Sequence, residues 1–374
     1  MTVDILDVSR RAPRVRAAWA SLEAVVDGLV VGDLTNVRWL TGFTGSAGVV
    51  VVLPDRIVLI TDGRYGEQAE REMEASHCCG VVRVGRNAGE QLVLLAEATR
   101  DAVAVGFESA HTSHARWSQL TDSLPSSLVP TTGLVERGRR TKDADELALI
   151  ERACTIADAA LASVVPTLGP GRTEAQVRND LERIMRELGA TGPSYETIVA
   201  TGPVNASMPH HRPTGTPIEP GHTVIIDVGA LVGGYHSDMT RTFLIAEPTP
   251  LQREVYDAVL AAQVAGVAAV RPGLTTADLD GVCRGILADA GFGPWFSHGT
   301  GHGVGLVIHE DPFVNASGGW VLQEGDVVTV EPGVYRGDFG GVRVEDLVEV
   351  TSTGCRVLTR TPKDQPCLPS PPTT

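Results

Sequence analysis

The chain has 374 residues, enough for two domains of roughly 150 residues each. It carries 46 Asp and Glu against 31 Lys and Arg, and this net charge of −15 argues against nucleic acid or an anionic membrane as a partner. Hydrophobic residues make up 43% and charged residues 21%, which excludes a disordered, collagen-like or coiled-coil chain. We therefore expect an acidic, globular enzyme or binding protein.

No segment has the pattern of a membrane span or a secretory signal. The longest nearly uncharged apolar stretch, Ala258 to Val270, is shorter than the ~20 residues that a membrane helix needs. The first residues place acids ahead of any apolar run, which is the wrong order for a secretory signal. The six cysteines have neither C-x-x-C spacing nor the density of a disulfide scaffold. We expect a cytoplasmic protein with reduced thiols.

The first part of the chain alternates between helix and strand patterns. Apolar positions at helical spacing run from Arg11 to Val26, and β-branched runs predict strands over Gly28 to Val31, Val49 to Leu53 and Arg56 to Ile60. A basic, turn-prone segment from Glu136 to Lys142 follows. We place the domain boundary in this segment.

The second part begins with a helical pattern that opens at Asp143 and continues past Ala160, with Glu146 where a capping box requires it. Further on, strand patterns dominate around one long helix. The strands are expected over Thr223 to Val228, Met239 to Ile245, Asp326 to Val330 and Gly341 to Val350, and the helix over Leu251 to Ala269. This composition indicates an α+β fold. The tail, residues 361–374, holds five prolines and is predicted to be disordered.

Histidines and acids gather in the second half of the chain. Seven of the ten histidines fall within one hundred residues: His210, His211, His222, His236, His298, His302 and His309. The segment DVGALVGGYHSD places Asp227 and Asp238 around Gly233-Gly234, so that a hairpin would fold the two carboxylates toward each other. Two ionised carboxylates brought together in this way need a cation between them.

Two further strands each bring a glutamate into an apolar setting, Glu331 in VVTVEPGVY and Glu345 in GVRVEDLVEV. Between the two pairs of acids lies HGTGHGVGLVIHE, which contributes His302. A single Asp or His of this kind is usually structural, but five in one pattern favour a functional site. One imidazole and four carboxylates suit two divalent ions bridged by shared carboxylates.

Other hydrolase motifs are absent from the sequence. It contains neither a G-x-S-x-G elbow nor an H-E-x-x-H helix, so no motif indicates a serine hydrolase or a zincin metallopeptidase. The Gly-rich run at residues 299–305 fits neither phosphate-binding pattern. The metal-dependent interpretation therefore remains the best supported by the residues.

The sequence resembles the two-domain Xaa-Pro peptidases, prolidase and aminopeptidase P, which have the creatinase-like pita-bread fold. NVRWLTGFTGS is similar to the family's amino-terminal domain, and the stretch from Arg140 to Leu147 is similar to its linker. Five segments match the catalytic domain in the family's order: IVATGPVNASMPHH, DVGALVGGYHSDMTRTF, HGTGHGVGLVIHE, VEPGVY and GVRVED. The resemblance implies a creatinase-like α/β domain over residues 1–141 and a pita-bread metallopeptidase domain over residues 142–360.

The resemblance also implies a role for individual residues. Asp227 would hold the first metal, Asp238 and Glu345 would bridge both, and His302 and Glu331 would complete the second. The supporting residues would be His210 near the substrate backbone, His298 lining the proline pocket, His309 at the substrate carbonyl, and Arg343 and Thr240 beside the bridging carboxylates. His211, His222 and His236 match no motif position, and we expect them to be structural or exposed.

The chemistry of such a site agrees with that assignment. Two cations ~3.5–4 Å apart lower the pKa of a bridging water toward ~7 and so generate hydroxide near neutral pH. Glu331 would pass the water's proton to the leaving nitrogen, and His309 and His210 would stabilise charge on the carbonyl oxygen. The first metal would also bind a free substrate amino group, as in an exopeptidase, and the resemblance implies that its substrates are short proline-containing peptides.

Several alternatives stay open or are disfavoured. A creatine amidinohydrolase and a non-catalytic pita-bread binding module are disfavoured because every metal ligand is present, and methionine aminopeptidase lacks the amino-terminal domain. The sequence does not separate a dipeptidase from an aminopeptidase P. Oxygen-rich ligation favours Mn²⁺ or Mg²⁺, while the imidazole admits Co²⁺, Zn²⁺ or Fe²⁺, and we expect two divalent ions per chain, with Mn²⁺ as the first choice. In the resembling family the amino-terminal domain helps to form a homodimer, so a homodimer is expected.

Overall fold

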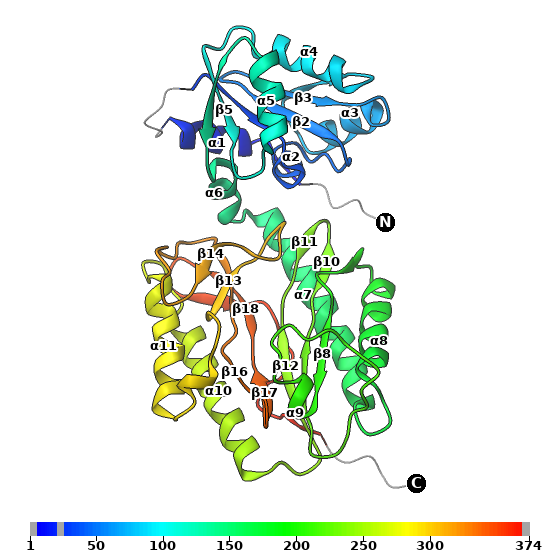
Figure 1. Cartoon of the computed structure of the whole chain (residues 1–374), viewed down its shortest axis with the longest axis vertical. Coiled ribbons are helices and arrows are strands. Elements are labelled where there is room, and N and C mark those ends of the chain that lie inside the picture. The colour runs from blue at the N-terminus through cyan, green and yellow to red at the C-terminus, as the bar shows by residue number, and fades with distance from the viewer. Residues whose placement is uncertain (1–5, 21–25, 369–374) are drawn as a thin grey trace. The chain divides into compact units, whose positions relative to one another are not determined.

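The computed structural model describes residues 6–20 and 26–368. The chain divides into two compact units, Met1–Arg139 and Arg140–Thr374, close to the boundary predicted at residue 141 (Figure 1). Among the described residues, no helix is both long and apolar enough to cross a bilayer.

The first unit is built on a six-stranded mixed sheet of order β4-β3-β2-β1-β5-β6. Strand β1 pairs with β2 in antiparallel and with β5 in parallel orientation. Its strands are β1 (Gly28–Val31), β2 (Gly48–Val52), β3 (Ile57–Thr61), β4 (Gly80–Val84), β5 (Ala104–Glu108) and β6 (Ser127–Thr131). Its helices are α1 (Arg11–Trp19), α2 (Leu34–Thr41), α3 (Gly66–Ala75), α4 (Ala88–Ala98), α5 (His114–Ser123) and α6 (Leu134–Arg140).

A core of alternating β-branched residues holds this unit together. Val30, Val51 and Ile60 from the sheet pack with Leu95 of α4 and Leu120 of α5. The strands predicted from β-branched runs are confirmed within one residue. The helix predicted from Arg11 is shorter than expected because α1 ends at Trp19, and residues 21–25 of that prediction lie outside the described part of the chain.

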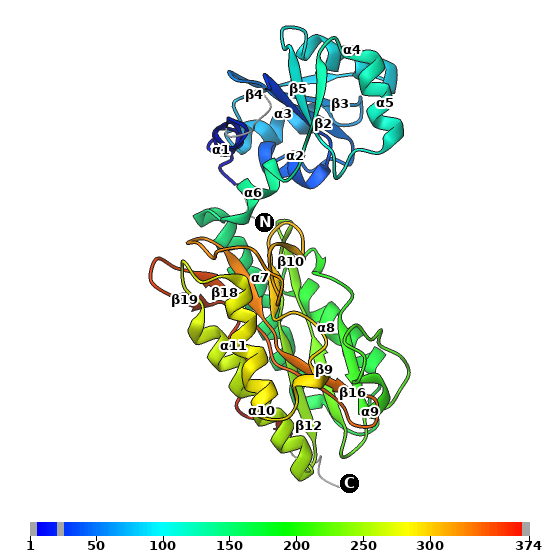
Figure 2. The same ribbon diagram turned by 60° about the vertical axis from the view of Figure 1, so that its left-hand side comes forward.

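The second unit places its strands between two pairs of helices (Figures 1 and 2). The helices are α7 (Ala144–Val164), α8 (Glu174–Glu187), the one-turn α9 (Gly202–Asn205), α10 (Pro250–Ala269) and α11 (Thr276–Asp289), with short 3₁₀ turns at Val165–Thr167 and Gly293–Trp295. Helix α7 begins with the predicted capping box. The Asp143 side chain accepts a hydrogen bond from the Glu146 N–H, and the Glu146 side chain accepts one from the Asp143 N–H. Helices α8 and α11 were not predicted individually.

Two larger sheets carry the residues of interest. One has the order β20-β12-β9-β8 and the other β14-β13-β15-β18-β19, beside a small sheet β11-β10-β7 and a hairpin β16-β17. In the first half of this unit the strands are β7 (Gly192–Pro193), β8 (Ile198–Thr201), β9 (Thr223–Asp227), β10 (Ala230–Val232), β11 (Tyr235–His236) and β12 (Thr240–Ile245). In the second half they are β13 (Gly301–Gly303), β14 (Glu310–Val314), β15 (Val327–Val330), β16 (Gly333–Arg336), β17 (Gly340–Arg343), β18 (Asp346–Val350), β19 (Cys355–Val357) and β20 (Cys367–Leu368).

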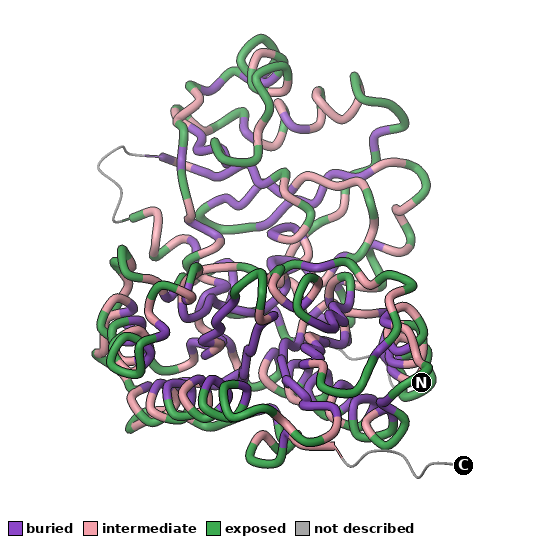
Figure 3. Tube along the Cα trace, turned by 60° about the horizontal axis from the view of Figure 1, so that its bottom comes forward, coloured by how far each residue is buried: buried purple, intermediate pink, exposed green. Residues whose placement is uncertain are grey.

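Buried residues concentrate in these strands, whereas the outer faces of the helices are exposed (Figure 3). The single strand predicted from Gly341 to Val350 is in fact two, β17 and β18. They are separated because the chain leaves the ladder at Val344 and Glu345, where the Glu345 N–H donates to the Thr240 carbonyl at 3.1 Å. This break is what turns the Glu345 side chain toward the other sheet.

The prediction of a disordered tail is wrong for residues 361–368. Strand β20 pairs in parallel with β12, and the Tyr256 hydroxyl donates to the Lys363 carbonyl at 2.7 Å. The Lys363 ammonium also forms an ion pair with the buried carboxylate of Asp346. Backbone pairing and a buried counter-charge thus order a segment whose prolines suggested otherwise. Residues 369–374 of that prediction lie outside the described residues.

Candidate active site

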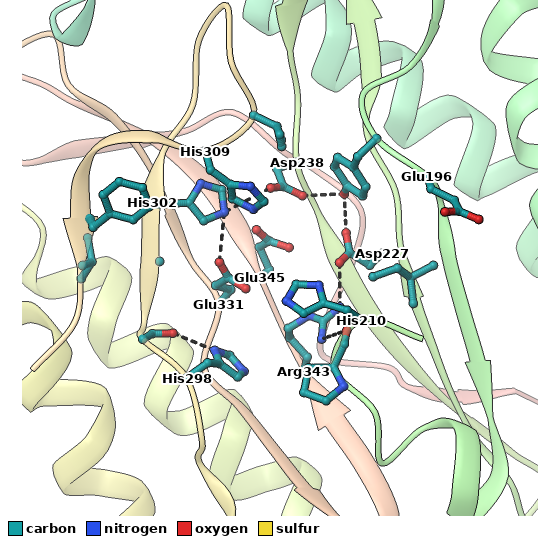
Figure 4. A pocket seen from close by; sticks show the side chains of 18 of the residues that line it. Glu196, His210, Asp227, Asp238, His298, His302, His309, Glu331, Arg343 and Glu345 are labelled. Carbon is teal, nitrogen blue, oxygen red and sulfur yellow. Dashed lines mark hydrogen bonds and ion pairs between the residues drawn. The ribbon is translucent and has the colours of Figure 1, made fainter. Parts of the chain in front are cut away.

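A cavity of about 440 Å³ opens in the second unit, where the ends of strands from its two larger sheets meet (Figure 4). Its wall contains all of the predicted site residues except Thr240. These wall residues are His210, Asp227, Asp238, His298, His302, His309, Glu331, Arg343 and Glu345. Thr240 lies directly behind the cavity wall, hydrogen-bonded to two of them.

Three of the carboxylates converge on one point. Asp227 ends β9, Asp238 precedes β12 by two residues, and Glu345 directly precedes β18. The β9–β12 register places Asp227 opposite Thr240, while the intervening β10–β11 hairpin turns at Gly233 and Gly234. One oxygen from each carboxylate lies within 4.8 Å of the other two. The predicted approach of Asp227 and Asp238 is therefore present, with Glu345 added from a distant strand.

Burial makes this cluster costly to ionise without a counter-charge. Burial, together with the charges of the neighbouring carboxylates, raises the pKa of Asp238 and of Glu345 well above their usual values. The Oε1 atom of Glu345 is buried and has no hydrogen-bond partner among the described residues. An orphaned carboxylate oxygen that faces two other carboxylates fits a divalent cation, which takes oxygen ligands of this kind.

His302 and Glu331 stand beside the three carboxylates. The Nε2 atom of His302 lies 3.6 Å from Oδ2 of Asp238 and 3.3 Å from Oε1 of Glu331. The Nδ1 atom of His302 donates to the Gly303 carbonyl at 3.1 Å, which directs Nε2 toward the acids. Burial opposes ionisation of Glu331. The hydrogen bond and the charge of His302, together with the charges of His298 and Arg343, outweigh burial and lower the pKa of Glu331 to about 2.

A buried arginine, Arg343, forms hydrogen bonds at the base of the carboxylate cluster. Arg343 donates to Oδ2 of Asp227 at 2.7 Å, to the Thr240 hydroxyl at 2.9 Å and to the Tyr335 hydroxyl at 2.7 Å. Thr240 in turn donates to Oε2 of Glu345 at 2.7 Å. The guanidinium therefore touches one carboxylate directly and a second one through Thr240, as expected for a residue that orients both.

The three predicted catalytic histidines differ in exposure. His210 and His309 are exposed at the cavity, and the His309 ring lies edge-on to that of His302 with centroids 4.4 Å apart. His298 is more enclosed: its Nδ1 donates to the Gly299 carbonyl at 2.8 Å, so in the neutral ring Nε2 accepts from the Tyr335 hydroxyl at 3.1 Å. Burial lowers the pKa of His298, which favours this neutral form.

This arrangement, with the matching families, identifies the chain. Residues 148–352 match the metallopeptidase family M24, and residues 11–141 match the creatinase/prolidase N-terminal domain. The protein belongs to metallopeptidase family M24. The predicted family resemblance and the fold class, a pita-bread domain preceded by a creatinase-type domain, are thereby confirmed.

Relatives of this M24 metallopeptidase extend over most of its length. An uncharacterized peptidase of Bacillus subtilis is 37% identical over 346 residues, which cover 91% of this chain and 95% of the relative. The structure of an Xaa-Pro dipeptidase from Bacillus anthracis is similar with a TM-score of 0.91 at 37% identity, covering 96% of this chain and all of that one. An X-Pro aminopeptidase from Thermotoga maritima is similar with a TM-score of 0.85 at 30% identity, covering 92% of this chain and 98% of that one.

The M24 pocket also contains residues that sequence reasoning missed. The Tyr195 hydroxyl lies within hydrogen-bond distance of both Asp238, at 2.5 Å, and Asp227, and can donate its one hydrogen to either of them. Burial raises the pKa of that hydroxyl well above its usual value. No local pattern indicates this, because Tyr195 comes from a segment that precedes β8, far along the chain from both acids. His211, which was expected to be structural or exposed, is buried at the pocket wall and bonds the buried Glu174. His222 and His236 do not line the pocket.

Proposed function

We propose that the protein is a metal-dependent exopeptidase that hydrolyses the Xaa-Pro bond of dipeptides or of the amino terminus of short peptides. The observation that carries the proposal is the convergence of Asp227, Asp238 and Glu345, with His302 and Glu331 alongside. One Glu345 oxygen in this cluster has no hydrogen-bond partner in the described part of the chain. The Xaa-Pro dipeptidase and X-Pro aminopeptidase among the similar solved structures support the choice of substrate.

The donor set suits two divalent cations. Asp227 would hold the first, Asp238 and Glu345 would be shared, and His302 with Glu331 would complete the second. Four carboxylates and one imidazole form an oxygen-rich set that favours Mn²⁺, while the imidazole also admits Co²⁺, Zn²⁺ or Fe²⁺. When bound, such cations supply the positive charge that activates water near neutral pH and polarises a carbonyl group.

The chain's own residues would handle protons and charge. The nitrogen of a peptide bond to proline is a tertiary amide nitrogen that leaves as a secondary amine, so it must receive a proton. Glu331 would carry that proton from the attacking water to the nitrogen, since a carboxylate in the pocket wall can both accept and donate. His309 and His210, both exposed at the cavity, would donate hydrogen bonds to the carbonyl oxygen as negative charge develops there.

The shape of the site would restrict the substrate. A cavity of about 440 Å³ holds a short peptide better than a folded chain. Carboxylates at the Asp227 end would attract a free amino group, which favours cleavage beside an amino terminus. We also propose, from the resemblance alone, that the protein is a cytoplasmic homodimer. Sedimentation of the purified protein would reveal the dimer, and a monomer would contradict it.

A panel of peptides tests the proposed function. Protein stripped of metal and reconstituted with Mn²⁺ is expected to hydrolyse Ala-Pro or Ala-Pro-Ala and to leave Ala-Ala and acetyl-Ala-Pro largely intact. The ratio of the first two rates distinguishes a dipeptidase from an aminopeptidase P. Equal cleavage of Ala-Ala would contradict proline specificity, and cleavage of the acetylated peptide would contradict an exopeptidase.

A further inference from the structure

A buried carboxylate outside the cavity binds both ends of the segment that carries His210. Glu174 is the first residue of α8, and its side chain is fully buried. Among the described residues, its carboxylate accepts hydrogen bonds only from the segment 201–214, which runs from the end of β8 to the pocket rim. No metal ligand proposed above bonds it.

The two oxygens of Glu174 divide their partners between the beginning and the end of that segment. Oε1 accepts from the Thr201 N–H at 2.8 Å and from the Asn205 side-chain amide at 3.0 Å. Oε2 accepts from His211 Nε2 at 2.9 Å, and from the N–H and the hydroxyl of Thr214 at 2.9 and 2.8 Å. Five hydrogen bonds to one carboxylate therefore hold Thr201 and Thr214, which are thirteen residues apart in sequence, next to the same side chain.

His210 itself depends on this anchoring. Its exposed imidazole makes no hydrogen bond to any other described residue, so its direction is set by the backbone on either side. On one side the Pro209 carbonyl accepts from Arg343 at 3.3 Å, and on the other side His211 is bound to Glu174. A side chain held only through its neighbours is sensitive to the loss of either neighbour's contact.

We propose that Glu174 is a positioning residue, which fixes the His210 segment in its working conformation through His211 and Thr214. The proposal rests on the proposed function in that His210 is taken to act on the peptide carbonyl. It goes further because it assigns a role in the reaction to a helix residue that does not line the cavity.

Glutamine at position 174 gives the sharpest test. It keeps the shape of the side chain but replaces one acceptor oxygen with a donor, so at least two of the five donors lose their acceptor. Glu174→Gln is expected to lower kcat/KM for an Xaa-Pro peptide by about 10- to 100-fold, the usual effect of removing a group that orients an active-site side chain. The bound metal per chain is expected to stay unchanged.

Glu108 offers a matched control for general destabilisation. It is also a buried carboxylate, and it accepts from the N–H groups of Gly32 and Asp33 and from the Asn36 amide in the first unit. Glu108→Gln is expected to lower the thermal midpoint without a comparable loss of kcat/KM. An equal loss of kcat/KM in both variants would overturn the positioning role.

A double-mutant cycle separates positioning from a merely structural effect. If Glu174 acts through His210, then Glu174→Gln should change kcat/KM by less than about 2-fold in a His210→Ala background, because the group that it orients is already gone. A loss in that background as large as in the wild type would overturn the proposal. Should the glutamine variant fail to fold, Thr214→Val removes only one of the five donors and is expected to give a smaller loss with the same non-additivity.

Hydrogen exchange provides a readout that needs no turnover. In Glu174→Gln the amides of Thr201 and Thr214 are expected to lose protection, while those of β12 keep theirs. Unchanged exchange at both amides would overturn the proposal whether or not the protein cleaves Xaa-Pro peptides. Conversely, a protein that shows this exchange pattern but no Xaa-Pro hydrolysis would contradict the proposed function and leave the anchoring intact.

Discussion

The Nη2 atom of Arg343 lies 2.7 Å from Oδ2 of Asp227, which sets a permanent cation against the carboxylate cluster. Both side chains are largely enclosed, with 4% and 14% of their surfaces exposed. In the absence of divalent ions, Arg343 is thus a principal counter-charge for a group of acids that repel one another.

Removal of this arginine is therefore expected to depend on the metal state. Arg343→Ala should lower the thermal midpoint more in metal-free protein than in protein loaded with Mn²⁺, because the bound cations replace part of the missing charge. Arg336→Ala is the control, since Arg336 is an exposed partner of Asp338. Equal shifts in the two metal states would contradict a shared electrostatic role.

The ligand assignment predicts different metal contents for different variants. Asp238→Ala is expected to remove both metals, because a bridging carboxylate belongs to both coordination spheres, and Glu345→Ala should do the same. His302→Ala should mainly weaken the second. Elemental analysis of the dialysed variants measures this directly. Two metals per chain in the Asp238 variant would rule out its bridging role.

His309 is predicted to act on the transition state rather than on the metals. His309→Ala should keep the wild-type metal content and lower kcat by ~10²–10³, the usual loss for one donor to a developing oxyanion. His222→Ala, at a histidine that does not line the cavity, should leave kcat unchanged. Steady-state kinetics at saturating peptide decides the point, and an unaltered kcat in the His309 variant would assign that residue a structural role.

Two buried glutamates should respond oppositely to acid. Burial alone would raise the pKa of Glu174, but the hydrogen bonds that it accepts from His211, Thr214, Asn205 and Thr201 together outweigh burial and hold that pKa below the usual 4.5. Its stabilising effect is therefore complete above about pH 4.5 and is lost as the pH falls through the folded-state pKa. Burial instead raises the pKa of Glu108, so ionisation of that group above pH 4.5 disfavours the fold.

Thermal midpoints as a function of pH measure this difference. The thermal midpoint of wild type should exceed that of Glu174→Gln by most at neutral pH, and this difference should become smaller in acid. The thermal midpoint of wild type should instead rise relative to that of Glu108→Gln as the pH falls. Parallel curves for the two variants would contradict the opposite pKa shifts.

Local patterns were sufficient to predict part of the site. Asp227 and Asp238 stand just before and just after a single hairpin, so their approach follows from a short stretch of sequence and a Gly-Gly turn. The capping box at Asp143 is likewise a local signal. Strands β1, β2, β3, β9, β12 and β15 followed from β-branched runs for the same reason.

The remaining contacts depend on long-range packing that no local pattern contains. Tyr195 reaches Asp238 only because β8 and β12 both pair with β9, and Glu174 reaches His211 across 37 residues. The ordered tail was missed because the parallel pairing of β20 with β12 joins segments more than one hundred residues apart. These contacts are set by the register of the assembled sheets.

The central claim is that the carboxylate cluster holds the metals on which hydrolysis depends. Its most direct test is a titration of metal-free protein with Mn²⁺, in which bound metal and the rate of Ala-Pro hydrolysis are measured on the same samples. We predict no turnover in the metal-free protein and a rate that rises with occupancy to a maximum at two ions per chain. Full turnover in excess chelator, with the metal content confirmed as nil, would contradict the claim.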